Sequence, residues 1–421
     1  HGREVSLARW SIALVLLGAC GGGGGNGGTS SPPDPTTETS TPPTDTGRTD
    51  SVTDSVTDTG RTDTGTEDTG TRWTAARDWG PLDAAVAQRM EARLATLHDE
   101  VGSPGIAAAV VDLGEGTMWV SSVGVADLAT DRPWTPELSY AIGSVSKTYT
   151  TSMVLQLVDE GVVSLDDPLE SWVSTVWSGQ GVTVRHLIQH TSGIASYNYV
   201  GSFDGSLDYT PQELVDWAAD REPTLRFAPG SQWEYSNTNF VLLGLIVEEA
   251  TGDTFEAALQ ARLLSPLGLA HTSMPERYDA GAVRGYQSDD GGPLYDASDE
   301  GSPSMGWAAG GMQSTPVDVA LWGAALFQGE VVSSDRLAEM TTPLLIDGQE
   351  VGYGLGLFGG IDADYGHNWG HTGGTGGQLT YLWWIEGADA VLVTMVNSFE
   401  GDINTAANEL WIAYLDLAAS R

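Results

Sequence analysis

Strand-like patterns lie near both ends of the region that follows residue 72, and a long stretch of helical spacing separates them. The strand patterns cover residues 106–112, 117–125, 379–385 and 391–396. Helical patterns cover 84–101 and 403–417, and in the middle section 184–189, 211–220, 239–250, 255–264 and 317–327. The simplest fold that buries these faces is mixed α/β: one antiparallel sheet built from both chain ends, flanked by helices, with a mostly helical lobe inserted.

The first 72 residues differ in composition from the rest of the chain. A short apolar run follows two arginines, as in a secretory signal peptide, and the segment ending at Cys20 resembles the lipobox of bacterial lipoproteins. Glycine, threonine, aspartate and proline then dominate, which predicts a disordered linker. We therefore expect a lipoprotein-type signal peptide (1–20), a linker (21–72) and one folded domain (73–421). The alternative is an ordinary signal peptide with an incidental cysteine.

Charge and cysteine content limit the expected partners. Acylation of Cys20 would hold the protein by a lipid anchor at the cell envelope, on its periplasmic or extracellular face. A formal net charge of -39 argues against nucleic acid as a partner. The single cysteine excludes an internal disulfide, and no histidine has ligand spacing with acidic residues, so we expect no metal and no other cofactor.

Lys147 is the only lysine in the chain, and Ser144 precedes it by three residues. Arginine supplies every other side-chain cation apart from histidine, but a guanidinium cannot be deprotonated whereas an ammonium can become a base. An apolar helical stripe follows the pair, so Ser144 is expected at a helix N-terminus, where backbone N–H groups favour a developing negative charge. Spacing of three residues places both side chains on one helix face. The pair is interpreted as a nucleophile and its base.

Two further segments accompany this pair: Tyr235-Ser236-Asn237 and His371-Thr372-Gly373-Gly374. Together with Ser144-Val145-Ser146-Lys147, they resemble the penicillin-recognising serine hydrolases, in particular the D-alanyl-D-alanine carboxypeptidase and class C β-lactamase branch. The resemblance covers roughly residues 84 to 417 and implies the β-lactamase/transpeptidase-like fold. Taken singly, Tyr235 could be a core tyrosine, Asn237 a helix N-cap and His371 a solvated histidine in a glycine-rich turn.

The resemblance implies a role for each motif residue. Ser144 is the acylated nucleophile, and Lys147 and Tyr235 share the proton transfers, with the choice of base left open. Asn237 contacts the acyl side of the substrate. The strand that lines the cleft supplies the other substrate-binding residues: His371, Thr372, Gly373 and Gly374. The backbone N–H groups of Ser144 and Gly374 form the oxyanion hole. The histidine at 190 is interpreted as structural.

Two positions bear on the substrate. His371 stands where β-lactamases of the class usually carry lysine. Because the ordinary pKa of histidine is near 6.5, we expect that if His371 binds an anion, this binding weakens as pH rises from about 6 to about 8. Phe358 stands where carboxypeptidases carry an arginine that grips the terminal carboxylate.

The lead hypothesis is a D-alanyl-D-alanine carboxypeptidase-like peptidase acting on small peptides, among them peptidoglycan stem peptides. β-Lactams are expected to act as acylating ligands. An esterase or a β-lactamase on the same fold is the alternative, and a non-catalytic wall-peptide binding protein is the third possibility.

Overall fold

The computed structural model describes residues 78–362 and 365–418. The expected signal peptide, Cys20 and the linker lie outside these residues. Within the described ranges, no helix combines the length and the apolar character needed to cross a bilayer.

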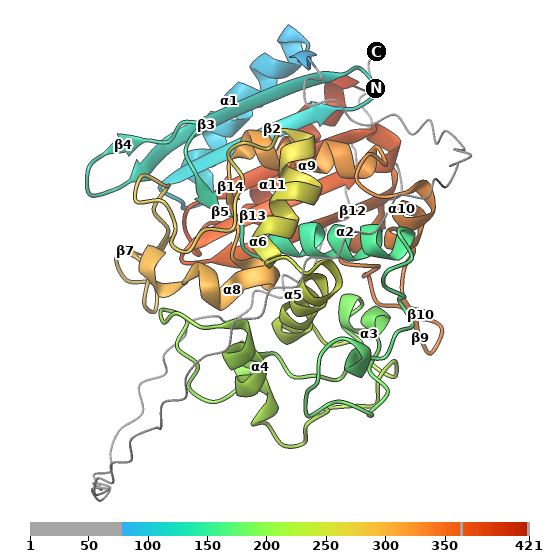
Figure 1. The fold of residues 1–421 in the computed structure, drawn as a ribbon. Coiled ribbons are helices and arrows are strands. Elements are labelled where there is room, and N and C mark those ends of the chain that lie inside the picture. Colours follow the sequence, from blue (N-terminus) through green and yellow to red (C-terminus); the bar gives the residue numbers. More distant parts are fainter. Residues whose placement is uncertain (1–77, 363–364, 419–421) are drawn as a thin grey trace, which may run out of the picture. The chain divides into compact units, whose positions relative to one another are not determined.

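A single large sheet forms the centre of the fold (Figure 1). Its strands follow the order β1-β3-β2-β14-β13-β12-β11, and β4 pairs with β3. Strands from the two chain ends meet where β2 pairs antiparallel with β14, as the sequence predicts. The bounds are β1 (Gly80–Pro81), β2 (Gly105–Asp112), β3 (Thr117–Asp127), β4 (Arg132–Pro133), β11 (Phe358–Asp362), β12 (Gly366–Thr375), β13 (Gln378–Ile385) and β14 (Ala390–Val396).

The sheet is mixed rather than purely antiparallel. The two-residue β1 runs parallel to β3, while the other neighbouring pairs are antiparallel. A helix and β2 separate β1 from β3 in the chain, so no tight turn reverses its direction. Alternation does not mark β11 and β12, because their glycines provide no side chain that could show a pattern.

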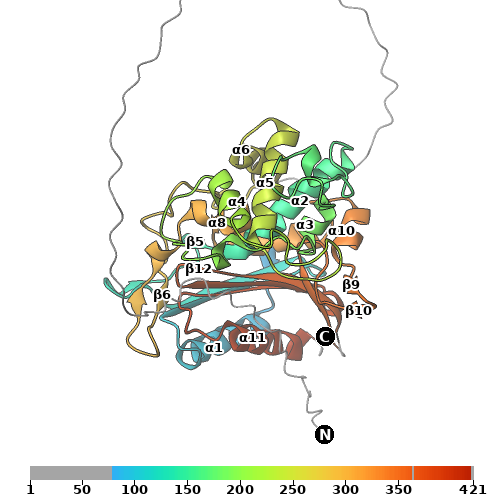
Figure 2. The ribbon, with the colours of Figure 1, turned by 90° about the horizontal axis from the view of Figure 1, so that it is seen from below.

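Helices cover both faces of the sheet (Figure 2). α1 (Ala84–Glu100) and α11 (Ile403–Ala418) pack on one face, and α9 (Pro316–Phe327) packs on the other. The helical lobe, which includes α2 (Ser146–Asp159), lies on the side of the sheet opposite α1 and α11 and shares its core with α9. Its remaining α-helices are α3 (Val184–Ile188), α4 (Pro211–Ala219), α5 (Asn237–Thr251), α6 (Phe255–Leu259), α7 (Ser265–Leu267), α8 (Pro303–Gly310) and α10 (Ser334–Met340).

The pleat of β2 explains why the sheet is buried on both faces. Ala107, Ala109 and Val111 join the core under the helical lobe, whereas Ile106 and Val110 join the core under α1 and α11. Successive side chains of a strand point to opposite faces, so a continuous apolar run serves both layers. On α1, the predicted stripe of Val86, Met90, Leu94 and Leu97 is buried as its helical spacing requires.

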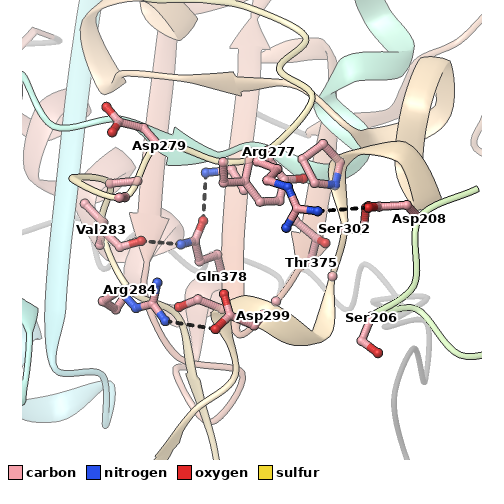
Figure 3. Close-up of a pocket in the computed structure, with 18 of the residues that line it drawn as sticks. Ser206, Asp208, Arg277, Asp279, Val283, Arg284, Asp299, Ser302, Thr375 and Gln378 are labelled. Carbon is pink, nitrogen blue, oxygen red and sulfur yellow. Dashed lines mark hydrogen bonds and ion pairs between the residues drawn. The ribbon is translucent and has the colours of Figure 1, made fainter.

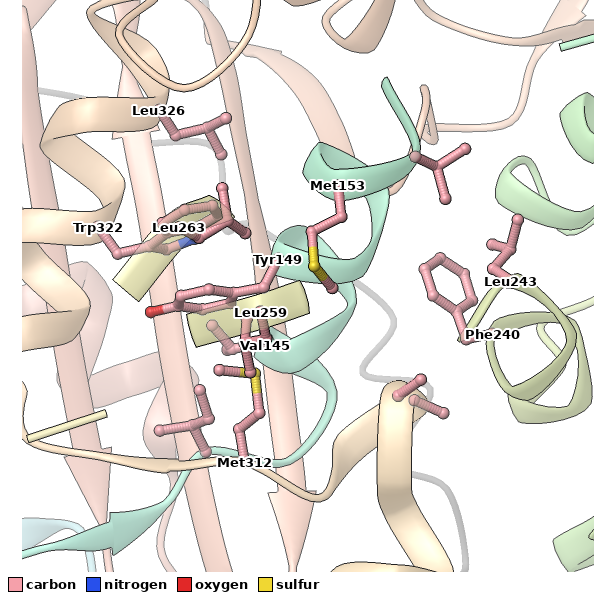
Figure 4. Close-up of a cluster of buried hydrophobic side chains, with 14 of the residues drawn as sticks. Val145, Tyr149, Met153, Phe240, Leu243, Leu259, Leu263, Met312, Trp322 and Leu326 are labelled. Carbon is pink, nitrogen blue, oxygen red and sulfur yellow. The ribbon is translucent and has the colours of Figure 1, made fainter. Parts of the chain in front are cut away.

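The helix α2 is buried on nearly every side, which fixes the position of the residues at its N-terminus. Tyr149 stacks on Trp322 of α9 with ring centroids 3.8 Å apart, and Val145 and Met153 pack nearby (Figure 4). Each large side chain that is buried in this way contributes about 1.5–3 kcal/mol. This packing around α2 therefore fixes the position of its first turn, which carries Lys147.

Candidate active site

Ser144 lies in a short 3-10 turn, Gly143–Val145, that leads directly into α2. Its side chain is largely buried, with the residue 7% exposed. Lys147 sits in the first turn of α2, and its Nζ lies 3.0 Å from the Ser144 Oγ. The predicted helix N-terminus and the shared helix face are both present.

Lys147 is fully buried and contacts only uncharged hydrogen-bonding groups among its described partners. Its Nζ lies 2.7 Å from the Asn237 Oδ1 and 2.6 Å from the Ala309 carbonyl oxygen. Burial lowers the pKa of Lys147 well below its ordinary value, because the ammonium loses its hydration. A neutral amine has two N–H bonds, which match these two oxygens. Its lone pair is then left for the Ser144 hydroxyl proton.

Tyr235 covers the other side of Lys147. Its ring centroid lies 4.8 Å from the Lys147 Nζ, and the residue is 6% exposed. Burial raises the pKa of Tyr235, and its nearness to Ser144 lowers it by a smaller amount. Although the two hydroxyls are close, the Tyr235 hydroxyl makes no hydrogen bond of good geometry with a described residue. Tyr235 therefore faces the nucleophile as a protonated phenol.

Asn237 does not cap a helix with its side chain. α5 begins at Asn237, and the preceding residue occupies the cap position without a side-chain cap bond. The Asn237 Oδ1 accepts from Lys147, and its Nδ2 donates to the Asn198 Oδ1 at 3.2 Å. Asn198, which the sequence motifs do not mark, also lines the pocket beside Ser144.

The third motif, residues 371–374, lies in the last part of β12 and runs close to the backbone of Ser144. β12 pairs with β11 only as far as Gly370, so residues 371–375 pair with β13 alone. A Cβ on Gly373 would lie 2.0 Å from the Ile142 carbonyl oxygen and 2.9 Å from the Ser144 backbone nitrogen. A Cβ on Gly143 would lie 2.5 Å from the Gly374 backbone nitrogen. The close approach brings together the two backbone N–H groups expected for the oxyanion hole.

His371 is completely buried and is not a solvated histidine in a turn. Its Nδ1 lies 2.6 Å from the Thr372 carbonyl oxygen, so Nδ1 carries the proton and donates it to that oxygen. Burial, with a smaller effect from Lys147, lowers the pKa of His371 to about 3. The expectation that His371 changes charge between about pH 6 and 8 is therefore wrong, because desolvation disfavours the imidazolium.

We expect the His371 imidazole to remain neutral from pH 6 to pH 8. Its pKa is depressed, so protonation begins only well below this range. The measurement is the pH dependence of its ring NMR signals, assigned by comparison with His371→Gln. A titration midpoint between pH 6 and 8 would contradict the expectation.

His190 holds the backbone on both sides of Tyr235. Its carbonyl accepts from the Glu234 N–H at 3.0 Å, and its Nδ1 accepts from the Ser236 N–H at 3.2 Å. Its ring lies 4.3 Å from the Tyr235 ring, and the residue is fully buried. His190 has a positive φ of 58°, which few residue types besides glycine and asparagine adopt readily.

We expect His190→Asn to keep far more activity than His190→Phe. Asparagine tolerates the positive φ and offers an oxygen for the Ser236 N–H, whereas phenylalanine keeps only a ring. Displacement of Tyr235 in the phenylalanine variant should lower kcat about 100-fold. Steady-state kinetics, with thermal unfolding as the folding control, tests this; equal losses in both variants would contradict it.

Phe358 leaves the site without the arginine of the carboxypeptidases. Its ring stacks on Tyr235 at 6.2 Å and lies 5.0 Å from the His371 ring. The pocket beside Ser144 is lined by no lysine, arginine or histidine of the described chain, although Glu300 lines it. Residues 78–362 and 365–418 also contain no cluster of histidine, cysteine or acidic residues that could hold a metal.

Similarity to known proteins agrees with this geometry. The chain is 30% identical over 333 residues to penicillin-binding protein 4 of Amycolatopsis lactamdurans, covering 72% of this chain and 84% of the relative. It is 32% identical over 223 residues to esterase EstB of Burkholderia gladioli, covering 47% of this chain and 55% of the esterase. A crystal structure of a D-stereospecific amidohydrolase from Streptomyces sp. superposes with a TM-score of 0.67 at 32% identity, covering 79% of this chain and 98% of the amidohydrolase.

The family-level comparison spans the described fold apart from β1 and the last residues of α11. The sequence model of the β-lactamase family matches residues 82–415, from the start of α1 to the last turns of α11. The matched range includes Ser144, Lys147, Tyr235 and His371, whose side chains the fold brings close together. The chain therefore belongs to the β-lactamase family of serine hydrolases.

Proposed function

We propose that the protein hydrolyses amide or peptide bonds of D-amino-acid substrates through an acyl-enzyme on Ser144. The observation that carries this proposal is the buried Lys147, whose Nζ lies 3.0 Å from the Ser144 Oγ and whose other contacts are the uncharged oxygens of Asn237 and Ala309. An amine in this setting is a base ready to accept the serine proton.

The distances between these groups support the following acylation step. Lys147 takes the hydroxyl proton while the Ser144 Oγ attacks the substrate carbonyl carbon, and the N–H groups of Ser144 and Gly374 stabilise the oxyanion. The phenol of Tyr235 donates its proton to the leaving amine, because burial raises its pKa and keeps it protonated. Lys147 then returns a proton to Tyr235. A water molecule hydrolyses the acyl-enzyme by the reverse proton transfers.

The charge of the site favours a leaving group without a charge over a leaving group that carries a free terminal carboxylate. Phe358 occupies the position of the carboxypeptidase arginine, and Glu300 is the charged residue of the pocket beside Ser144. His371 adds no positive charge at neutral pH, because burial lowers its pKa to about 3. Together with the similarity to a D-stereospecific amidohydrolase, these features support an amidase or peptidase that does not require a terminal carboxylate.

The expected location gives a natural source of such substrates. If Cys20 is acylated, the folded domain hangs by its linker at the cell envelope, where peptidoglycan stem peptides contain D-alanyl bonds. Labelling with a radioactive fatty acid, compared between the natural chain and Cys20→Ala, tests this anchor. Equal labelling of both would contradict it.

An esterase is the second candidate. The aromatic contacts of Phe358 with Tyr235 and His371 make one wall of the site apolar, which suits an uncharged ester, and EstB is a relative. The deciding experiment compares kcat/KM for a D-alanyl amide, a D-alanyl-D-alanine peptide and a short aryl ester, with Ser144→Ala as the blank. Intact mass after exposure to penicillin measures acylation of Ser144. Rapid ester turnover without amide hydrolysis would favour the esterase, and inactivity in every assay would favour a binding protein.

A further inference from the structure

The side-chain amide of Asn237 has two possible orientations, and only one of them suits a base at Lys147. With its Oδ1 toward Lys147, the amide accepts an N–H of the neutral amine and leaves the lone pair to the Ser144 hydroxyl. Rotated by half a turn about its last side-chain bond, the amide would present its NH2 group, which would donate to that lone pair and block it. The two orientations have almost the same shape, so the hydrogen-bond partners of the amide must select between them.

Ser196 and Asn198 supply the partners that select the orientation. The Asn237 backbone N–H, whose direction is set by the start of α5, donates to the Ser196 Oγ at 2.8 Å. Ser196 is 2% exposed, so its own hydroxyl proton needs a protein acceptor, and the Asn198 Oδ1 lies 2.5 Å from its Oγ. The same Asn198 Oδ1 accepts from the Asn237 Nδ2 at 3.2 Å. This chain of donors starts at a backbone group that cannot turn around, and it leaves the Asn237 Oδ1 directed at Lys147 at 2.7 Å.

The short turn that carries Asn198 is held against the start of α5. The Thr238 hydroxyl donates to the Ala195 carbonyl oxygen at 2.7 Å and accepts from the Tyr197 N–H at 2.9 Å. These two bonds fix the residues that precede Asn198 on the first turn of the helix. They keep the Asn198 oxygen within reach of the Asn237 amide.

We propose that Ser196 and Asn198 are positioning residues for acylation, which hold the Asn237 amide with its oxygen, and not its NH2 group, toward Lys147. Both act through Asn237 and not on the reacting atoms themselves. The inference rests on the proposed function, in which Lys147 accepts the Ser144 proton. It does not depend on whether the substrate is an amide, a peptide or an ester.

Loss of this control has a recognisable pH signature. The ammonium form of Lys147 has no lone pair, so it faces the Asn237 oxygen whether or not the Asn198 oxygen is present. The neutral amine can meet either end of an amide that is free to turn, and this additional arrangement favours deprotonation while it blocks the base. A variant without the Asn198 oxygen should therefore have a lower Lys147 pKa and a lower maximal acylation rate. Both changes have the same factor, so acylation well below the pKa should stay at the wild-type rate.

Lys147 is the group whose titration such a profile reports. The titratable side chains around it are those of Tyr235, His190 and His371. Burial raises the pKa of the phenol and lowers the pKa of both imidazoles, so all three are uncharged near neutral pH.

Other charges near the site are the same in every variant. Glu300 lines the pocket beside Ser144. A larger neighbouring pocket of about 440 Å³ contains two arginines that pair with acidic residues, Arg277 with Asp208 at 3.2 Å and Arg284 with Asp299 at 3.6 Å (Figure 3). None of these charged groups is a described hydrogen-bond partner of Lys147. A difference between the wild type and a variant therefore reports the Asn237 amide.

The chain allows a direct measurement, because Lys147 is its only lysine. Protein grown with isotope-labelled lysine has a single labelled side chain, and its NMR titration measures the Lys147 pKa without any substrate. Asn198→Leu keeps the size of the side chain and removes its oxygen. We expect this variant to lower the Lys147 pKa by about one pH unit and maximal acylation about tenfold, the effect of one hydrogen bond. Acylation is followed by intact mass with penicillin and with a D-alanyl amide, across the pH range in which the protein stays folded.

Three further variants sharpen the comparison. Asn198→Asp keeps an oxygen for the Asn237 amide, so it should retain most of the maximal acylation, while its negative charge raises the Lys147 pKa. Ser196→Ala should lower the Lys147 pKa as Asn198→Leu does, because the Asn198 amide loses the donor that orients it. Ser192→Ala is the control: it removes a similar buried bond, from the Ser192 Oγ to the Asn239 Oδ1 at 2.7 Å, and should leave the Lys147 pKa unchanged.

Several outcomes would overturn the inference. One is a Lys147 pKa that is unchanged or raised in Asn198→Leu, because a general loosening of the site would hydrate the amine and raise its pKa. Another is an equal loss of acylation in Asn198→Leu and Asn198→Asp. Absence of acylation in the wild type would reject the proposed function instead, and the NMR titration alone would then decide the inference.

Discussion

Lys147→Arg is expected to lower the acylation rate about 1,000-fold or more, although the substitution keeps a long cationic side chain. The amine at this position must lose its proton to accept the one on Ser144, and a guanidinium does not lose its proton at any working pH. Arginine is also larger, and the Nζ is enclosed by Ser144, Asn237 and the Ala309 carbonyl. The measurement is single-turnover acylation of Ser144 by a D-alanyl amide and by penicillin, followed by intact mass.

The control for Lys147→Arg separates lost chemistry from lost folding. A buried guanidinium without a carboxylate partner costs stability, so thermal unfolding must accompany the kinetics. Lys147→Met supplies a variant that fits the apolar site without a charge and should be equally inactive. An arginine variant with acylation within about tenfold of the wild type would reject Lys147 as the base.

The sequence predicts the sheet and the nucleophile because both leave local patterns. β2, β3, β13 and β14 were recognisable from their apolar runs, and their assembly from both chain ends is confirmed. Ser144 and Lys147 stand three residues apart at the start of a helix, and this spacing allows the 3.0 Å contact between their side chains.

Other features of the site leave no local pattern. The Ala309 carbonyl that contacts Lys147 is a backbone group, which every residue possesses, so its role depends on the packing of α8 against α2. The charge state of His371 depends on its burial in the folded protein. The glycine-rich sequence around it gives no apolar pattern from which this burial could be predicted. Asn198 reaches the pocket from a short 3-10 turn, Tyr197–Tyr199, that belongs to none of the three motifs.

Gly373→Ala is expected to lower kcat about 100-fold to 1,000-fold, the size of effect seen when an oxyanion-hole donor is lost. The new Cβ would lie 2.0 Å from the Ile142 carbonyl oxygen and 2.9 Å from the Ser144 backbone nitrogen. Both are backbone atoms and cannot rotate away. The turn that carries Ser144 must therefore move off β12, which separates its N–H from that of Gly374.

The neighbouring glycine supplies a matched control for this prediction. The closest atoms to a Cβ on Gly374 would be side-chain ends that can give way, the Leu379 Cδ2 at 3.1 Å and the Phe399 Cε1 at 3.6 Å, and the nearest backbone atom, the Gln378 carbonyl oxygen, lies at an ordinary contact distance of 3.8 Å. Gly374→Ala should therefore lower kcat far less, by about fivefold, although it adds the same methyl group one residue along the same strand.

Steady-state kinetics and thermal unfolding of both variants test this difference. Equal kcat losses in the two alanine variants would mean that the approach of β12 to Ser144 does not set the oxyanion geometry. If kcat falls only in Gly373→Ala, and this variant still folds, then catalysis depends on the close backbone contact between the turn that carries Ser144 and Gly373 of β12.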